Sequence, residues 1–158
     1  MNKQFIGAIK LIGEFDIRHF RNGKLLSCEH IHNTTTNVGF AEVAGLINEA
    51  TTIGFKWLAL DSSSTAATAA NTALAAEITT NGLTRVAATC SRTTTTQSND
   101  TARLRHTWTA TGAQTVQGAG VFDTSTAVAG TLLARTTFTA KGMEADDTLN
   151  IDYKVKVA

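Results

Sequence analysis

Charge is scarce in this sequence of 158 residues: charged residues make up 17% of it, and the formal net charge is +1. A nonspecific nucleic-acid binder needs a strongly positive field, because most of its affinity comes from contacts with phosphates. The composition therefore excludes nucleic acid as the expected partner. Hydrophobic residues reach 42%, which is enough for one domain with a core of its own.

Cysteine is almost absent. The two cysteines, Cys28 and Cys90, are far apart in the sequence and form no C-x-x-C pair. This spacing argues against both a zinc ribbon and a redox pair. We expect two buried free thiols in a reducing cytoplasm, with one disulfide as the alternative.

Long apolar runs are absent as well. A membrane-spanning helix needs about 18 consecutive apolar residues, and no stretch approaches that length. The segment from Phe5 to Ile12 is apolar, but Lys10 interrupts it and no small-residue cleavage site follows, so it does not read as a signal peptide. We expect it to be a strand or a docking arm, and we expect no membrane partner.

The motifs of common catalytic sites are missing. The sequence has no G-x-S-x-G, no P-loop, no G-x-G-x-x-G after a strand and no H-E-x-x-H. We therefore expect neither an enzyme, with its catalytic residues, nor a cofactor. The acidic pair Asp146-Asp147 lacks further oxygen ligands at a suitable spacing, so it indicates a capped turn more than a calcium site.

Threonine and alanine supply much of the chain, and their pattern predicts a β protein. Thr is β-branched, which favours strands, and its hydroxyl keeps an exposed face polar without charge. Alternation of apolar and polar residues predicts short strands at 55–60, 86–91, 103–110, 115–122, 132–140 and 149–157. We predict an all-β fold, a β-sandwich or jelly roll, with an N-terminal strand or arm over 1–13 and one sandwich domain over 14–158.

A hairpin and a helix complete the predicted elements. Asn22-Gly23 is typical of a type I′ turn. Pairing outward from it puts six residues on one buried face, namely Phe15, Ile17, His19, Leu26, Cys28 and His30. Helical spacing predicts one short helix over about 38–48, capped by Thr36 or Asn37, and a brief helical turn after Asn71 through Ile78.

Two side-chain patterns are weak candidates for a binding site. His30 and His32 point to the same face of a strand, and three such pairs around a threefold axis would supply six nitrogens to one metal; the alternative is that His30 forms a hydrogen bond in the core. Arg103 and Arg105 share a strand face and could form a basic stripe with Arg85 and Arg92. A solvated sheet face is the simpler interpretation of the stripe, and a docking surface for an acidic partner is the other.

Five runs of the sequence, the first of which begins at Asn37, resemble small structural proteins of tailed bacteriophages, of the capsid decoration (cement) type. The runs are Asn37-Val38-Gly39-Phe40-Ala41-Glu42-Val43-Ala44-Gly45-Leu46-Ile47, Asn71-Thr72-Ala73-Leu74-Ala75-Ala76-Glu77-Ile78, Gly118-Ala119-Gly120-Val121-Phe122-Asp123, Leu132-Leu133-Ala134-Arg135 and Asp147-Thr148-Leu149. The resemblance extends from about residue 35 to the end.

The resemblance implies a jelly-roll-like body on the surface of the virion capsid, made in the host bacterial cytoplasm. The implied partners are the major capsid protein and further copies of the chain in a homotrimer. The expected protein contacts are Phe5, Ile6, Ile9, Leu11 and Ile12, together with Arg103 and Arg105. Some related sequences are tail or fibre components, so a tail, neck or fibre attachment module is the alternative function. A carbohydrate-binding sandwich would need Trp57 and Trp108 to be exposed.

Overall fold

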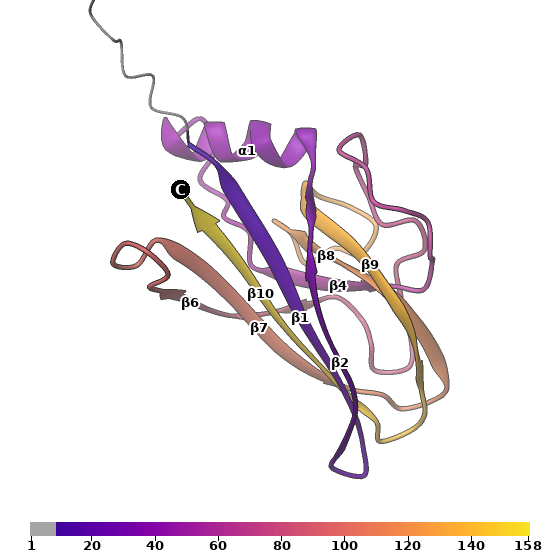
Figure 1. Cartoon of the computed structure of the whole chain (residues 1–158). Coiled ribbons are helices and arrows are strands. Elements are labelled where there is room, and N and C mark those ends of the chain that lie inside the picture. Colours follow the sequence, from indigo (N-terminus) through magenta and orange to yellow (C-terminus); the bar gives the residue numbers. More distant parts are fainter. Residues whose placement is uncertain (1–8) are drawn as a thin grey trace, which may run out of the picture.

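The computed structural model describes residues 9–158. It contains two antiparallel sheets of five strands each and one short helix, which confirms the predicted all-β sandwich (Figure 1). One sheet has the strand order β2-β1-β10-β7-β6 and the other β3-β9-β8-β4-β5. The element bounds are β1 Leu11–Arg21, β2 Lys24–His32, β3 Thr34–Thr35, α1 Asn37–Ile47, β4 Trp57–Asp61, β5 Val86–Ala87, β6 Thr89–Thr93, β7 Thr101–Thr109, β8 Gln114–Phe122, β9 Leu132–Met143 and β10 Thr148–Val157.

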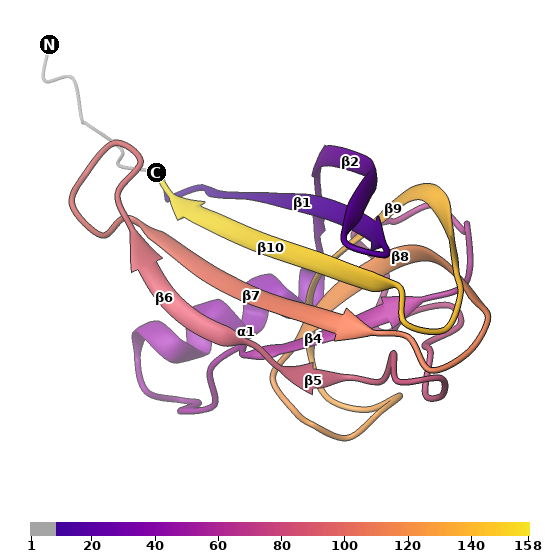
Figure 2. The same ribbon diagram turned by 90° about the horizontal axis from the view of Figure 1, so that it is seen from below.

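The chain passes between the sheets at both lateral edges. On one side β2 ends at His32 and the chain enters β3 at Thr34 in the other sheet. On the opposite side β5 ends at Ala87 and β6 begins at Thr89, which Figure 2 shows as one nearly continuous path. Each edge strand of one sheet therefore continues into an edge strand of the other.

The core fills the space between the sheets, as the alternation predicted. Leu149, Ile151 and Tyr153 of β10 are fully buried, and the ring of Tyr153 packs on Phe15 of β1 with 4.6 Å between the ring centroids. Leu58 and Leu60 of β4 meet them from the other sheet. The opposite face of β4 is covered too, because Ala59 belongs to a second small cluster, formed with Leu74, Phe122 and Leu132.

The helix α1 begins one residue before the predicted range and ends one residue before its predicted end. Thr36 caps it, since its hydroxyl oxygen accepts a hydrogen bond from the Gly39 amide at 3.0 Å. Gly39 lies against the backbone of Leu133 in β9, where a β-carbon would stand 2.5 Å from the Leu133 carbonyl oxygen. The contact fastens α1 to the second sheet. No described helix has the length and apolarity that crossing a bilayer requires.

The hairpin β1–β2 differs from the prediction in its register. The turn has the expected positive φ angles at Asn22 and Gly23, but the pairing shifts between His19 and Phe20, so that Leu26 is an extra residue in β2. Beyond this bulge His19 stands opposite Ser27 and Ile17 opposite Glu29. The expectation that Leu26, Cys28 and His30 are buried is therefore wrong: all three are exposed.

The predicted helical turn after Asn71 is also wrong, because this segment is extended and irregular. The buried carboxylate of Asp61, at the end of β4, accepts hydrogen bonds from the amides of Ala75 and Ala76 at 3.1 and 2.9 Å. These amides have a side-chain partner in place of helical carbonyls. The segment is thereby held over the outer face of the second sheet.

Candidate functional site

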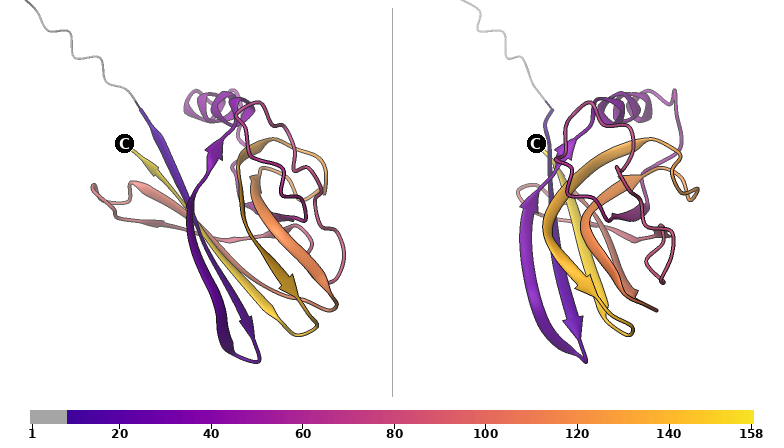
Figure 3. Two further views of the ribbon diagram at one scale, coloured as in Figure 1. Left: turned by 45° about the vertical axis from the view of Figure 1, so that its right-hand side comes forward. Right: turned by 90° about the vertical axis from the view of Figure 1, so that its right-hand side faces the viewer.

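An apolar groove opens between the sheets at the end of the sandwich where α1 lies. Figure 3 shows the two sheets diverging toward this end, with α1 on the side of the second sheet. The groove encloses about 240 Å³. None of the described residues that line it is charged; its walls include Leu11, Val43, Phe55, Leu104, Tyr153 and Val157.

Tyr153, one of the residues that line the groove, carries a polar atom buried in the core. The side chain is fully buried and its hydroxyl forms no hydrogen bond with any described residue. Burial raises the pKa of Tyr153 above its usual value, so the hydroxyl stays protonated at neutral pH. A buried hydroxyl without a partner costs about 1–3 kcal/mol.

One of the predicted apolar contact residues, Leu11, lines the groove, whereas Ile12 lies on the outer face of the same sheet. Ile9 is 71% exposed and Ile12 44%. Leu11 and Ile12 belong to β1 and pair with Val157 and Lys156 of β10, so they complete the subunit's own sheet. Phe5 and Ile6 lie outside the described residues.

The outer face of the first sheet is polar and contains several ion pairs. Asp16 accepts a hydrogen bond from Lys154 at 3.0 Å and contacts His30 at 2.8 Å. Burial alone would raise the pKa of Asp16, but the hydrogen bonds from His30 and Lys154 outweigh it and hold this pKa below its usual value. Further along the face, Arg103 forms an ion pair with Asp152. Most charges on this face are thus neutralised within the sheet.

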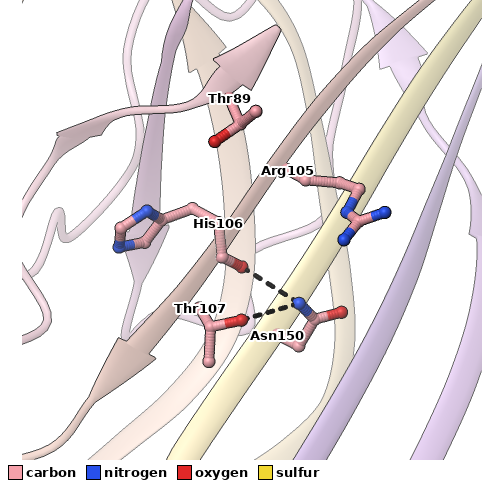
Figure 4. A pocket seen from close by; sticks show the side chains of 5 residues that line it. All are labelled: Thr89, Arg105, His106, Thr107 and Asn150. Atoms are coloured by element: carbon pink, nitrogen blue, oxygen red, sulfur yellow. Dashed lines mark hydrogen bonds between the residues drawn. The ribbon is translucent and has the colours of Figure 1, made fainter. Parts of the chain in front are cut away.

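Arg105 differs from Arg103 because none of the carboxylates in residues 9–158 lies within ion-pair distance of it. It borders a shallow polar hollow of about 340 Å³ with Thr89, Thr107 and Asn150 (Figure 4). The side-chain amide of Asn150 donates to the Thr107 hydroxyl at 2.8 Å and holds the floor of the hollow in place. The exposed guanidinium and hydroxyls suit a partner surface that carries carboxylates.

The predicted stripe of four arginines does not form, because Arg85 is buried on another part of the molecule. It makes a two-pronged ion pair with Glu77, donates to the carbonyl of Ala129 at 2.8 Å and stacks over Phe122. These contacts make Arg85 a structural residue. Arg85 is consequently not available for docking.

The histidine pair lies on the outer face, not in the core as one interpretation had it. The rings of His30 and His32 stand 5.7 Å apart edge to face, and His30 contacts the carboxylates of Asp16 and Glu14 at 2.8 and 3.4 Å. Across residues 9–158, no group of three or more His, Cys, Asp or Glu side chains comes together as a metal site requires.

The two tryptophans lie in different environments. Trp108 is 3% exposed and its indole donates to the Thr84 carbonyl at 2.8 Å, while Trp57 is half-buried. The pair therefore offers no exposed aromatic platform for a carbohydrate.

The expectation of buried thiols is wrong, since Cys28 and Cys90 are both exposed and free.

Comparison of the chain with known protein families, curated protein sequences and solved structures finds no significant match. The functional argument therefore depends on the groove, the polar face and the sequence runs themselves. Sequence reasoning missed the groove, although one signal for it was present: the inward-facing series on β10 continues through Val155 and Val157. Those residues lie beyond the part of the core that the second sheet covers, so they line the groove.

Proposed function

We propose that the protein is a structural component of a tailed-bacteriophage virion, a decoration (cement) protein that docks on the major capsid shell and stabilises it. The proposal is carried by one observation: Arg105, with which none of the described carboxylates pairs, lies exposed on a hydroxyl-rich sheet face suited to contact with protein. Docking buries surface across capsid subunits, and the free energy of that burial opposes disruption of the shell.

The runs that resemble phage particle proteins support this proposal by their arrangement. The first run is α1, and it packs through Gly39 on Leu133, which belongs to another of the runs. Gly118 to Asp123 and Leu132 to Arg135 lie in the neighbouring strands β8 and β9, where Val121 pairs with Ala134. These three runs thus pack together at the second sheet, as expected of a shared framework.

The outer face of the first sheet is the surface that we assign to the capsid. Ile12 and Arg105 are exposed on it, and Arg103 lies beside them in its ion pair with Asp152. An exposed isoleucine and an exposed guanidinium provide an apolar anchor and a charge-assisted hydrogen-bond donor. The expected complement is a shallow capsid surface with carboxylates at its rim.

The test is binding to capsids that were assembled without this protein. Purified protein should sediment with mature capsids in a stoichiometric ratio and raise the temperature at which they open. Arg105→Glu combined with Ile12→Ser should weaken binding at least about tenfold, since interface centres carry most of the affinity. Leu25→Ser is the matched control, because Leu25 is 47% exposed but lies at the turn end of the same sheet.

Two outcomes would overturn the proposal. One is failure of the protein to bind mature capsids at micromolar concentration. The other is a location at the tail in a few copies per particle, measured by quantitative mass spectrometry of virions; that result would favour a tail, neck or fibre attachment role.

A further inference from the structure

We propose that the apolar groove of one copy of this chain receives the tip of the β1–β2 hairpin of a second copy, with Leu25 and Leu26 as its anchors. The inference goes beyond capsid docking and does not depend on it. Both surfaces belong to described residues, and they lie at opposite ends of the sandwich (Figure 1). Two copies can therefore join end to end.

The hairpin tip is an apolar projection. Figure 1 shows the turn between β1 and β2 at the end of the molecule farthest from α1. Leu25 is 47% exposed and Leu26 48%, and Leu26, the extra residue of the bulge, has no pairing partner in β1. Single exposed apolar residues are common on protein surfaces, whereas adjacent ones that form a patch mark a contact surface. Two consecutive leucines at a projecting turn meet that description.

The groove has the size and the polarity that suit these two side chains. Its volume is about 240 Å³, and the described residues that line it are apolar apart from Tyr153. A dry apolar cavity of about 150 Å³ already accommodates a benzene ring, so the groove has room for one leucine side chain and part of a second. It is smaller than the range of about 300–1,000 Å³ that is usual for small-molecule sites.

The charges around the two surfaces are complementary. Lys24 is exposed at the hairpin tip, none of the described carboxylates pairs with it, and Glu144 lies nearby in its ion pair with Arg21. At the groove, Glu42 lies in α1 and Glu49 follows it, and α1 contains no basic residue. The opposite wall begins beside a cation, since Lys10 precedes β1. Each end thus has both signs around an apolar centre, and unlike charges meet when Lys24 faces α1.

A hairpin tip in the groove of the next copy is a head-to-tail contact, because it uses two different surfaces. A free groove remains at one end of the pair and a free tip at the other, so further copies can add in a row. One hairpin tip is expected to bury less area than the roughly 1,200–2,000 Å² of stable complexes, so we expect weak association in solution. The outer sheet face stays free in each copy.

The test is a complementation experiment with full-length chains, measured by sedimentation velocity over a concentration series. The tip variant is Leu25→Ser with Leu26→Ser, and the groove variant is Val157→Lys, chosen because Val157 is half-exposed and tolerates a charge in the folded subunit. Each should weaken self-association at least about tenfold. A mixture of the two variants should still form a hetero-dimer, because each keeps the surface that the other lacks.

Two further variants control for effects on folding. Ile12→Ser removes an apolar side chain of similar exposure from the outer face of β1, and it should associate like the wild type. If Val157→Lys does not fold, Val43→Lys on the helical wall replaces it as the groove variant. The tip variant should keep the urea midpoint of the wild type, since its two side chains are exposed.

The charge of Lys24 gives an independent readout. Lys24→Glu should weaken association about threefold at low salt, because it places a carboxylate against the acidic helical wall. The difference from the wild type should disappear at about 1 M salt, where the screening length is about 3 Å. A loss that is equal at low and high salt would contradict the proposed orientation of the tip.

The outcomes separate this inference from the proposed function. A wild-type chain that stays monomeric at the highest concentration reached, or a mixture of tip and groove variants that stays monomeric, would overturn the inference. The tip variant should still bind capsids, whereas Arg105→Glu combined with Ile12→Ser should self-associate without binding them. Self-association of the wild type without capsid binding would overturn the proposed function alone.

Discussion

Asp147 accepts a hydrogen bond of 2.7 Å from Arg21, which precedes it by 126 residues. The same buried carboxylate contacts His19 at 3.0 Å and accepts from the Glu144 amide at 2.9 Å. It therefore joins the end of β1 to the turn before β10, at the end of the sandwich opposite the groove. The sequence pattern had suggested a turn-capping role for Asp146-Asp147, and Asp147 is the residue that performs it.

Asp147→Asn should lower the free energy of unfolding by about 1–3 kcal/mol. The side chain keeps its size but loses its charge and one acceptor, so Arg21 or His19 is left without a partner. Urea unfolding followed by tryptophan fluorescence measures the change. The neighbouring Asp146→Asn is the control: Asp146 is exposed with φ 69°, which Asn tolerates, so its effect should stay within about 0.5 kcal/mol. Equal effects of the two variants would contradict the assignment.

Acid should destabilise the wild type more than Asp147→Asn. Hydrogen bonds from Arg21 hold the pKa of Asp147 well below its ordinary value in the folded state. The folded state thus binds fewer protons than the unfolded state, whose aspartates titrate near about 3.9. The resulting stabilisation is complete above that pH and is lost as pH falls through the folded pKa. The difference between the urea midpoints of the wild type and Asp147→Asn should therefore be smaller at about pH 3 than at about pH 6. A difference that stays constant with pH would refute the linkage.

Gly39→Ala should destabilise the protein although the residue is helical. Helix propensity alone favours Ala over Gly by about 1 kcal/mol. The new β-carbon would however stand 2.8 Å from the Leu133 α-carbon and 2.5 Å from its carbonyl oxygen, and backbone atoms cannot move aside cheaply. We expect a net loss of more than about 1 kcal/mol in thermal or urea unfolding. Ala44→Gly, on the exposed side of α1, should cost only its propensity. An increase in stability for Gly39→Ala would show that α1 is not fastened to β9.

Arg135→Met should cost about 3–5 kcal/mol, because it leaves the carboxylate of Asp61 buried without its cation. Both side chains are almost fully buried and their charged groups lie 3.2 Å apart. Adding Asp61→Asn should recover part of the loss, since the amide oxygen can still accept from the Ala76 amide without carrying charge. Calorimetric melting of the single and double variants measures this coupling, and simple additivity would disprove it.

Both thiols should react with a chromogenic disulfide reagent in the folded protein. Cys28 and Cys90 are exposed and free, and we expect two thiols per chain without denaturant. Burial raises the pKa of the Cys90 thiol, which lowers its thiolate fraction, so Cys90 should be the slower of the two. Cys28→Ser identifies the phases by removing the faster one. A thiol that reacts only after unfolding would contradict the register of its strand.

Local pattern was sufficient for the helix α1 and for most strands, but not for the segment after Asn71 or for the shift inside the hairpin. Asn22-Gly23 specifies a turn and the first pairs beyond it, and the alternation in β10 specifies a face. A single extra residue at Leu26 carries no signature of its own, yet it turned Cys28 and His30 outward. The bulge is explained only by distant partners: it brings Glu29 to Lys141 in β9.

The same argument applies to the second sheet and to the groove. The role of Asp61 depends on Arg135, which is 74 residues away, and on amides that come together only in the folded chain. The groove depends on how far the two sheets diverge, a property of packing between elements. The residues that line it could be recognised as apolar, but their shared cavity could not.

The passage of both edge strands from one sheet into the other bears on how concentrated this protein can become. A long flat edge is a template on which another chain can add a strand, and uncontrolled addition leads to insoluble aggregates. Here the lateral edges bend away as β2 enters β3 and as β5 enters β6. Sheet extension at the sides is thereby discouraged, so strand addition from a neighbouring chain is not favoured at either lateral edge.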